Sequence, residues 1–178
     1  MGRKYFTASM KYRLLSMDEM VIIPYDKAYL QDLARLVTNI QQNEFGIPIT
    51  LEEQPDLLDI PGFFLSGKGN FWLALMDDSV AGCIALKDIG NGRGALRKMF
   101  VDARYRGKQH GVGQGLLDIL LAWAREKGFK EILLGTTDKF LAAHRFYEKN
   151  GFLSVPKNSL PQEFPVASVD SIFYCLSL

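Results

Sequence analysis

The sequence predicts one α/β domain of the α+β kind, built on a mixed sheet with helices on its faces. Two apolar runs, 71–76 and 80–87, are joined by the short polar turn 77–79, which is typical of an antiparallel hairpin. Farther along, residues 95–135 follow the order strand, glycine-rich turn, helix and strand, so the two outer strands should be parallel with a right-handed crossover. A hairpin followed by one such unit favours a mixed sheet.

Length, composition and charge exclude several classes of protein. A chain of 178 residues that is 48% hydrophobic fits one globular unit with a sizeable core. Its 21 Lys and Arg against 20 Asp and Glu leave no surplus of positive charge for a run of phosphates, which argues against nucleic acid as the main partner. No secretory h-region and no apolar run of about 18 residues is present, so we expect a cytoplasmic protein with no membrane partner.

The two cysteines and the N-terminal tail carry no functional signal. Cys83 and Cys175 lie in apolar, strand-like runs without the Cys and His spacing of a metal site. They are therefore expected to be buried core thiols, and no metal is predicted. Residues 1–16 form a basic, poorly patterned extension of unknown role, which places the single domain at 17–178.

The first third of the chain predicts a strand and two helices. Residues 21–24 are apolar and strand-like, and 27–40 carry apolar residues at helical spacing. The polar stretch 41–48, with its Gly and Pro, is predicted as a loop. Thr50 then precedes an acidic first turn, so it should cap a second, short helix that Pro61-Gly62 ends.

The remaining two thirds predict two further helices and four further strands. One helix follows the glycine stretch and runs to Lys127, with Gly128 at the position of a left-handed C-cap. Thr137 or Asp138 should cap the other, which stops at Asn150-Gly151. The strands are expected at 95–101, 131–135, 152–155 and 169–176.

The stretch from Arg106 to Gly115 predicts an anion site. A strand, a glycine-rich turn and a helix start direct free backbone N–H groups and the helix dipole at one spot. The glycines at 111, 113 and 115 lack the G-x-G-x-x-G spacing of a dinucleotide site, and no Gly-Lys-Ser/Thr of a Walker loop follows them. These residues alone leave the identity of the anion open.

Several stretches together strongly resemble the GNAT superfamily of acetyl-CoA-dependent N-acetyltransferases. They are Ala95–Val101, Tyr105–Lys108, Gly111-x-Gly113 and Ala143–Phe152. The hairpin runs also look like that family's central hairpin, and the resemblance covers about residues 21–178. It implies the GNAT fold, a mixed, mostly antiparallel sheet of six or seven strands with helices on both faces. This sheet would be splayed between the strand ending near Val101 and the strand 131–135, with acetyl-CoA in the splay.

The resemblance also implies where acetyl-CoA, as co-substrate, would bind. Arg106 or Lys108 would add charge near the pyrophosphate; Lys108 occupies the first position of the family's loop pattern, and Arg106 lies two residues upstream of it. Backbone N–H groups would cradle the pyrophosphate at Gln109, His110, Gly111, Val112, Gly113 and Gln114. The pantetheine arm would pair with a strand edge, and one N–H there could polarise the thioester carbonyl, at Met99, Phe100 and Val101. The alternative for this edge is a fully paired core strand.

Tyr147 is the predicted catalytic residue. The family places a tyrosine in the same Phe/Leu-Tyr-x-Lys-x-Gly-Phe context, as a general acid to the leaving CoA thiolate. The alternative is a plain core tyrosine. His144 lies one turn earlier on the same helix face and is read as a base or, with more weight, as a packing residue. Phe140 stands where the family often has an asparagine, so a polar contact to the cofactor arm is missing or replaced.

The general base is not identified by the sequence. An amine with a pKa of about 10.4 costs roughly 4.6 kcal/mol to deprotonate at pH 7, so a base or a water chain would help. Some family members carry a glutamate on the strand that ends at Val101, and this sequence has none. Glu44, Glu52 and Glu53 are substitutes among which the pattern does not choose, and each is also readable as a solvated charge.

We therefore expect an enzyme that moves an acetyl group from acetyl-CoA directly to a small-molecule or peptide amine in a ternary complex. Neither cysteine lies in a nucleophile context, which favours direct transfer. Two alternatives stay open: a non-catalytic acyl-CoA-binding or regulatory module on the same fold, and an interaction domain without a cofactor. The acceptor is not identified, and a homodimer is kept as an option for the assembly.

Overall fold

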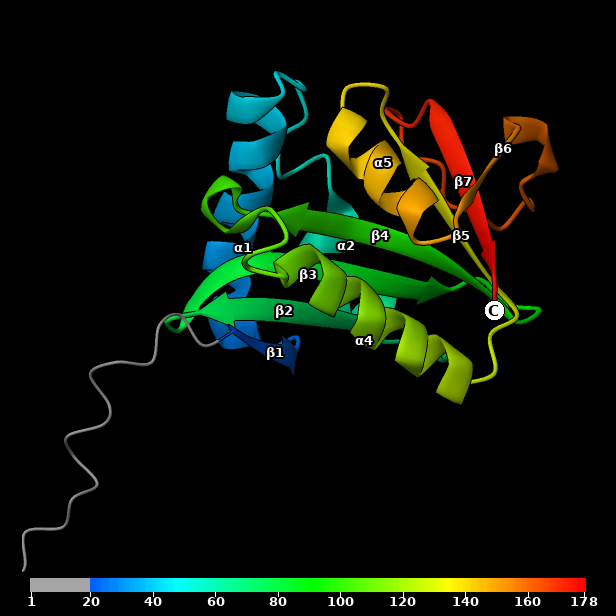
Figure 1. Cartoon of the computed structure of the whole chain (residues 1–178), viewed down its shortest axis with the longest axis horizontal. Coiled ribbons are helices and arrows are strands. Elements are labelled where there is room, and N and C mark those ends of the chain that lie inside the picture. The colour runs from blue at the N-terminus through cyan, green and yellow to red at the C-terminus, as the bar shows by residue number, and fades with distance from the viewer. Residues whose placement is uncertain (1–19) are drawn as a thin grey trace, which may run out of the picture.

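A computed structural model describes residues 20–178, and the predicted extension at 1–16 lies outside the described residues. Seven strands form one sheet in the spatial order β1-β2-β3-β4-β5-β7-β6 (Figure 1). The strands are β1 (Met20–Pro24), β2 (Asn70–Met76), β3 (Ser79–Asp88), β4 (Arg93–Val101), β5 (Glu131–Thr136), β6 (Leu153–Val155) and β7 (Ile172–Ser177). Within residues 20–178 only β4 and β5 pair in parallel, so the predicted mixed, mostly antiparallel sheet is confirmed.

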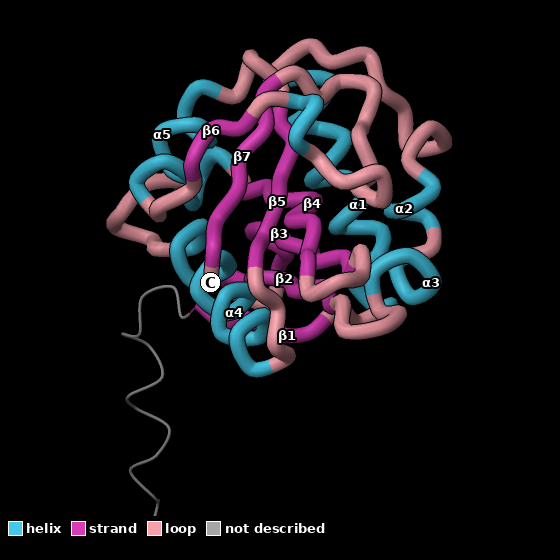
Figure 2. The backbone as a smooth tube through the Cα atoms, turned by 90° about the vertical axis from the view of Figure 1, so that its right-hand side faces the viewer, coloured by secondary structure: helices cyan, strands magenta, loops and turns pink. Residues whose placement is uncertain are grey.

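Helices cover both faces of this sheet. They are α1 (Leu30–Thr38), α2 (Pro55–Leu58), α3 (Ile60–Phe64), α4 (Val112–Glu126) and α5 (Leu141–Lys149). Alternate residues of the hairpin point to opposite sides: Phe71 and Leu73 pack in one core with α1 and α3, while Trp72 and Ala74 pack in another with α4. Figure 2 shows α1, α2 and α3 on one side of the strands and α4 and α5 on the other. None of these helices is long and apolar enough to span a membrane.

The hairpin and the glycine caps are confirmed in detail. Strands β2 and β3 pair in antiparallel fashion across the Asp77-Asp78 turn, whose two residues both have positive φ. Helix α4 ends just before Gly128, which has φ +76°, the left-handed conformation that favours glycine. Local sequence is sufficient at these points because each turn is decided by a few adjacent residues.

The predicted loop at 41–48 is wrong at its start. The first helix continues beyond α1 as a π-helical turn over Asn39–Glu44. Ile40 and Gln41 are both buried there, and the Gln41 amide exchanges hydrogen bonds with the buried Gln54 amide at 3.2 and 2.9 Å. Polar composition predicted a loop here. The partner that allows Gln41 to be buried lies 13 residues away, outside the local pattern.

The second predicted helix begins later than Thr50 and does not end at Pro61-Gly62. It forms as the two short helices α2 and α3, and each has a proline at its first or second position. Proline is favourable at a helix start, where its missing N–H costs nothing, so these prolines are starts rather than stops. The Asp59 carboxylate caps α3 by accepting the Gly62 N–H at 3.0 Å.

The last helix and strand also begin later than predicted. Helix α5 starts at Leu141, and neither Thr137 nor Asp138 is its N-cap. Thr137 and Asp138 instead tie the turn together: Thr137 Oγ1 accepts the Lys139 N–H, and the Asp138 N–H donates to Ser171 Oγ. Strand β7 starts at Ile172 rather than at 169.

Candidate functional site

The parallel strands β4 and β5 separate halfway along their length. The opening between them is the centre of the candidate site. They pair from Arg93 with Glu131 to Leu96 with Leu134. Beyond Leu96, β4 continues to Val101 and pairs only with β3, while β5 continues to Thr136 and pairs with β7. The predicted splay is therefore confirmed. Met99, Phe100 and Val101 do not form a fully paired core strand, because the edge facing β5 has no strand partner in residues 20–178.

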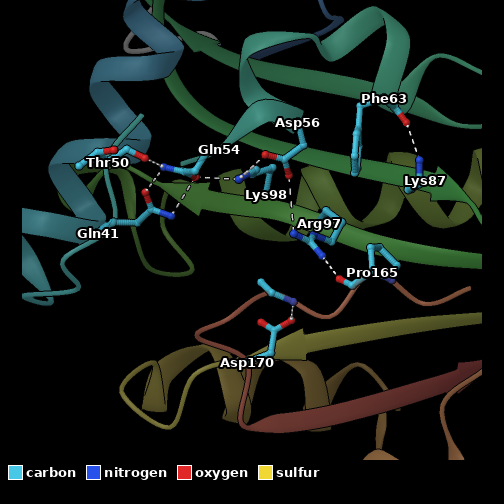
Figure 3. A network of polar contacts seen from close by, with 11 residues as sticks. Gln41, Thr50, Gln54, Asp56, Phe63, Lys87, Arg97, Lys98, Pro165 and Asp170 are labelled. Carbon is cyan, nitrogen blue, oxygen red and sulfur yellow. Dashed lines mark hydrogen bonds and ion pairs between the residues drawn. The ribbon is translucent and has the colours of Figure 1, made fainter. Parts of the chain in front are cut away.

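A β-bulge shapes this end of β4. Lys98 has φ +51°, which is rare for a residue with a side chain, and the register with β3 shifts between Cys83 and Ala85 at this point. In a regular strand Arg97 and Lys98 would point to opposite faces. The bulge instead lets both side chains reach Asp56 of α2, with Lys98 Nζ 3.1 Å from Oδ1 and an Arg97 terminal nitrogen 3.6 Å from Oδ2 (Figure 3).

The glycine stretch places the start of α4 beside the opening. Gly111 caps the helix with φ +66°, and its N–H and that of His110 turn back to the Gly107 carbonyl. A Cβ added at Gly113 would lie 3.7 Å from Met99, 3.8 Å from Val101 and 3.9 Å from Phe146. The first N–H groups of α4, which have no acceptor within the helix, therefore start next to the free end of β4 and to α5. This is the geometry of an anion site.

The two basic candidates of this loop differ in their surroundings. The Arg106 guanidinium donates to the Val101 carbonyl at 2.8 Å and forms a two-pronged ion pair with Glu44. Lys108 is exposed and makes no ion pair within the described part of the chain. Lys108 is thus available to a ligand, whereas Arg106 is held by Val101 and Glu44.

The other side chains of the loop stabilise its shape. The His110 ring packs edge-on against Tyr105, with the ring centroids 5.8 Å apart. Gln109 donates weakly to the Arg106 carbonyl at 3.4 Å, and Val112 is buried. The Gln114 amide donates to Asp118 and, at 2.9 Å, to Asn150 at the end of α5. These contacts hold the side chains of the loop, and the N–H groups of His110 and Gly111 are used by the Gly107 carbonyl. The first N–H groups of α4 are therefore the ones left for an anion.

Tyr147 lies on α5 facing the cavity at this end of the sheet. Its side chain is buried, and it packs against the rings of Phe146, Phe152 and Tyr174. Burial raises the pKa of its hydroxyl well above the usual value of 10. The phenol therefore stays protonated at neutral pH, as a proton donor must. The difference between its pKa and that of an alkyl thiol becomes larger, so the phenol is a weaker acid toward the thiolate.

His144 and Phe140 have structural surroundings. His144 Nε2 lies 2.9 Å from the Thr137 carbonyl, so the ring ties α5 to the end of β5. Phe140 packs edge-on against Phe45, with ring centroids 4.6 Å apart, and against Phe100 at 6.3 Å. An aromatic contact between three elements thus stands where the family often has a polar asparagine.

The cavity beside the opening has a volume of about 310 Å³. Its lining includes Met99, Phe100, Tyr147, Glu53 and side chains that the sequence reasoning missed: Gln54, Asp56, Arg97, Lys98 and Asp170. Of the glutamates proposed as bases, Glu53 lines the cavity and accepts the Thr50 N–H at 2.8 Å, Glu44 pairs with Arg106, and Glu52 does not line it. Two adjacent basic residues inside an apolar strand were the signal available in the sequence.

The buried polar network of the cavity is charged (Figure 3). Lys98 Nζ donates to Gln54 Oε1 at 2.7 Å and pairs with Asp56, and both Lys98 and Asp56 are more than nine-tenths buried. Burial lowers the pKa of Lys98, and the nearby Asp56 carboxylate opposes that shift. Asp56 Oδ2 is buried and has no hydrogen-bond partner among the described residues.

Comparison with known proteins gives one consistent family. A family model described as "Acetyltransferase (GNAT) family" matches residues 34–152. The crystal structure of a GNAT-family acetyltransferase from Staphylococcus aureus Mu50 is 39% identical, covers 89% of this chain and 99% of its own, and superposes with a TM-score of 0.86. A PaiA N-acetyltransferase from Thermoplasma acidophilum, solved with coenzyme A, shares the fold at a TM-score of 0.69, 17% identity, and coverage of 90% and 99% of the two chains.

Two curated relatives differ in how much they share with this chain. The N-acetylaspartate synthetase of Xenopus tropicalis is 36% identical over 104 residues, which are 56% of this chain and 37% of that protein. Streptothricin acetyltransferase A of Bacillus subtilis is 29% identical over 134 residues, 75% of this chain and 76% of that protein. The chain thus spans little more than a third of the length of the synthetase that it matches.

Proposed function

The chain belongs to the GNAT acetyltransferase family, and on this basis we propose that it transfers the acetyl group of acetyl-CoA to an amine. The observation that carries the proposal is the parting of β4 and β5 beyond Leu96 and Leu134, beside the glycine-capped start of α4. An exposed strand edge and a helix N-terminus meet there, and these are the two features that an amide-rich arm ending in a pyrophosphate needs.

The residues present fit acetyl-CoA. Of the backbone N–H groups predicted at 109–114, those of His110 and Gly111 donate to the Gly107 carbonyl, so the N–H groups of Val112, Gly113 and Gln114 at the start of α4 would take the pyrophosphate. Lys108, which is free of ion pairs in the described residues, would add the positive charge. Arg106 could join only by exchanging Glu44 for a phosphate. The edge formed by Met99, Phe100 and Val101 would pair with the pantetheine arm, which places the thioester near the bulge at Lys98.

Direct transfer is proposed because the chain offers no thiol nucleophile. Burial raises the pKa of the Cys83 thiol to about 12, and burial also raises that of Cys175. Both thiols therefore stay protonated at neutral pH, and a thiol is a poor nucleophile compared with its thiolate. Bound acetyl-CoA would supply the activated acetyl group, and Tyr147, protonated and facing the cavity, would give a proton to the leaving sulfur.

The acceptor is proposed to be a small amine rather than a peptide, because the cavity of about 310 Å³ suits a small molecule. The names of the two curated relatives specify aspartate and streptothricin, which are chemically different acceptors. The cytoplasm is proposed as the compartment, supported by two cysteines that form no disulfide.

The experiment measures release of CoA thiol with a panel of amines, together with the binding of acetyl-CoA by calorimetry. Acetyl-CoA should bind, and at least one amine should be turned over. Absence of both turnover and binding would refute the proposal. Binding without turnover would instead favour a non-catalytic acyl-CoA-binding module, a reading supported by the aromatic Phe140 in place of asparagine.

The Tyr147→Phe variant tests the acid separately. It keeps the ring contacts with Phe146, Phe152 and Tyr174 and removes only the hydroxyl. The transfer rate should fall by about 100-fold while CoA binding persists, since general acids contribute typically 10² to 10⁴ in rate. An unchanged rate would show that Tyr147 is not the proton donor.

A further inference from the structure

Charged side chains of both signs line the cavity next to the proposed acetyl site. Arg97 and Lys98 come from β4, and Asp170 comes from the segment that joins β6 to β7 (Figure 3). These residues are far apart in the sequence, and they meet because Arg97 reaches that segment by donating to the Pro165 carbonyl. The arrangement suits a ligand that carries charges of both signs.

Arg97 has binding capacity that the protein does not use. Its guanidinium makes one hydrogen bond among the described residues, to the Pro165 carbonyl, although it has five N–H groups. Its nearest carboxylate oxygen, Asp56 Oδ2, is 3.6 Å from the terminal nitrogen, beyond hydrogen-bond distance. The Asp56 carboxylate is bonded instead to Lys98 through its other oxygen at 3.1 Å. Arg97 therefore lines the cavity with its fork of N–H groups largely free.

One carboxylate oxygen of Asp170 accepts a hydrogen bond, and the other accepts none among the described residues. Oδ2 accepts the Ala167 N–H at 2.8 Å, and it lies so close to β5 that a Cβ at Gly135 would be 2.6 Å away. No bond to Oδ1 is formed within residues 20–178, and the side chain lines the cavity. The carboxylate thus sits at the end of β5, on the far side of the splay from Met99.

Cationic side chains from two segments face Asp170. Arg97 and Lys98 on β4 and Lys157 on its own segment oppose the increase that burial causes in its pKa. Across the cavity, Asp56 is matched by Lys98, the exposed Glu53 accepts the Thr50 N–H, and Tyr147 is a protonated phenol. Among the described residues that line the cavity, Arg97 is the cation without a carboxylate at hydrogen-bond distance. Asp170 and Glu53 are the anions without a matching side chain, and of these two Asp170 is half-buried while Glu53 is exposed.

We propose that this cavity takes an amino acid as acceptor, with the Arg97 guanidinium binding its carboxylate and Asp170 receiving the proton of its amine. A carboxylate matches the planar fork of a guanidinium, which binds both of its oxygens. An α-amino acid carries its amine two bonds from the carboxylate carbon, and Arg97 and Asp170 line the same cavity of about 310 Å³, which suits a molecule of that size. The inference rests on the proposed acetyl transfer and names its substrate class and its base.

The proton transfers of the step balance with these residues. The ammonium of the bound amino acid first gives one proton to Asp170, which passes it to water, and the neutral amine then attacks the acetyl carbon. Asp170 takes the second proton, which the nitrogen loses as the N–C bond to the acetyl carbon forms. Tyr147 gives its hydroxyl proton to the sulfur that is released when the C–S bond breaks. Exchange with water then returns both side chains to their starting states, and no oxidant or metal is needed.

The experiment compares each standard amino acid with its own C-terminal amide, which has the same amine and no carboxylate. At least one amino acid should be acetylated, with kcat/KM about 10- to 100-fold above that of its amide, because hydrogen bonds to charged groups are worth this much. The Arg97→Met variant should reduce this ratio to below about threefold, mainly through KM. Arg35→Met, on the exposed face of α1, is the matched control and should keep the ratio.

The Asp170→Asn variant tests the proton acceptor. Asparagine keeps an oxygen for the Ala167 N–H, so the segment should stay folded, while kcat should fall by about 100-fold. The decline of kcat toward acid pH that Asp170 causes should also disappear, which a purely structural role would not produce. Asp138→Asn, outside the cavity, is the control with an unchanged profile.

The outcomes separate the two proposals. Equal rates for acid and amide, or a preference that survives Arg97→Met, would overturn the amino-acid inference alone. So would acetyl-CoA binding together with transfer only to amines that lack a carboxylate. No binding and no transfer would overturn the proposed function as well. If Arg97→Met fails to fold, Arg97→Lys keeps the charge without the fork and should still lower the ratio several-fold.

Discussion

The two halves of the candidate site are built in different ways. The cradle at the start of α4 comes from ten consecutive residues, 106–115, and presents mainly backbone N–H groups. The neighbouring cavity, which is the proposed acceptor site, is assembled from segments as distant as Gln54, Lys98 and Pro165, and presents charged side chains. The cradle is therefore suited to the proposed co-substrate, acetyl-CoA, which stays the same between relatives. The cavity is suited to the acceptor, which can change between relatives without loss of the fold.

The largest expected effect breaks the cavity. Asp56→Ala leaves the buried Lys98 ammonium with Gln54 as its partner, and removal of one member of a buried pair costs about 3–5 kcal/mol. The free energy of unfolding, measured by urea titration, should fall by that amount.

Asp32→Ala is the matched control for this measurement. It removes a carboxylate from a pair with Arg35 that is more than half exposed, and exposed pairs are worth about 0–1 kcal/mol. An equal loss of stability in both variants would contradict the view that the cavity is held by a buried charge network.

The next effect breaks the cradle. A Cβ fits at Gly113 in ordinary contact with Met99 and Val101, but a longer side chain would fill the space in front of the first N–H groups of α4. Gly113→Leu should weaken CoA binding at least about 100-fold, since hydrogen bonds to a charged group are each worth about 1.5–3 kcal/mol. Calorimetric titration with CoA gives the dissociation constant.

Gly113→Ala serves as the control for steric filling. Its added methyl group would lie 3.7 Å or more from its neighbours, so affinity should change by less than about threefold, or under 0.7 kcal/mol. If alanine weakened binding as much as leucine does, the cradle would depend on the flexibility of Gly113 and not on open space.

A pH measurement sharpens the contrast, because the cavity titrates and the backbone cradle does not. Burial raises the pKa of Asp170 in the folded chain above its value of 3.8 in the unfolded chain. The folded state therefore binds more protons in this window, and stability falls as pH rises from 3.8 through the folded pKa. In Asp170→Asn this part of the decline should be absent, so the variant should gain stability relative to the parent between acid and neutral pH. A constant difference across that range would contradict the assignment.

The smallest expected effect concerns the ion pair that Arg106 of the cradle forms with Glu44. Glu44→Gln removes the charge that holds Arg106, whose pair with Glu44 is about one third exposed. Exposed pairs contribute about 0.2–1 kcal/mol, so release of Arg106 toward the phosphates should raise CoA affinity by about 1.5- to 5-fold, less at high salt. Arg104→Gln, which breaks a neighbouring pair with Asp102, should leave affinity unchanged. A lower affinity in Glu44→Gln would show that Glu44 positions the loop.

Sequence patterns by themselves determined the turns, hairpins and helix ends, whose conformation depends on adjacent residues. The β2–β3 hairpin follows from a polar turn between two apolar runs, and the left-handed Gly128 follows from the end of α4. The parallel β4–β5 pair and the splay were likewise predicted, with the family resemblance supplying the splay, and the backbone cradle stays a prediction. In each case the deciding residues lie within one turn or one strand–helix–strand unit, so no distant partner is required.

Only the tertiary structure decided the charged cavity beside the splay and the helix boundaries. The helical turn after α1 extends to Glu44 because the Gln41 side chain forms hydrogen bonds with Gln54. Pro55 and Pro61 lie at the starts of helices because turns precede them in the chain. Arg97 and Lys98 share Asp56 only because a bulge with a positive φ at Lys98 breaks the strand's alternation. Such contacts join residues 13 to 68 positions apart, and their energies depend on burial, which a local pattern does not contain.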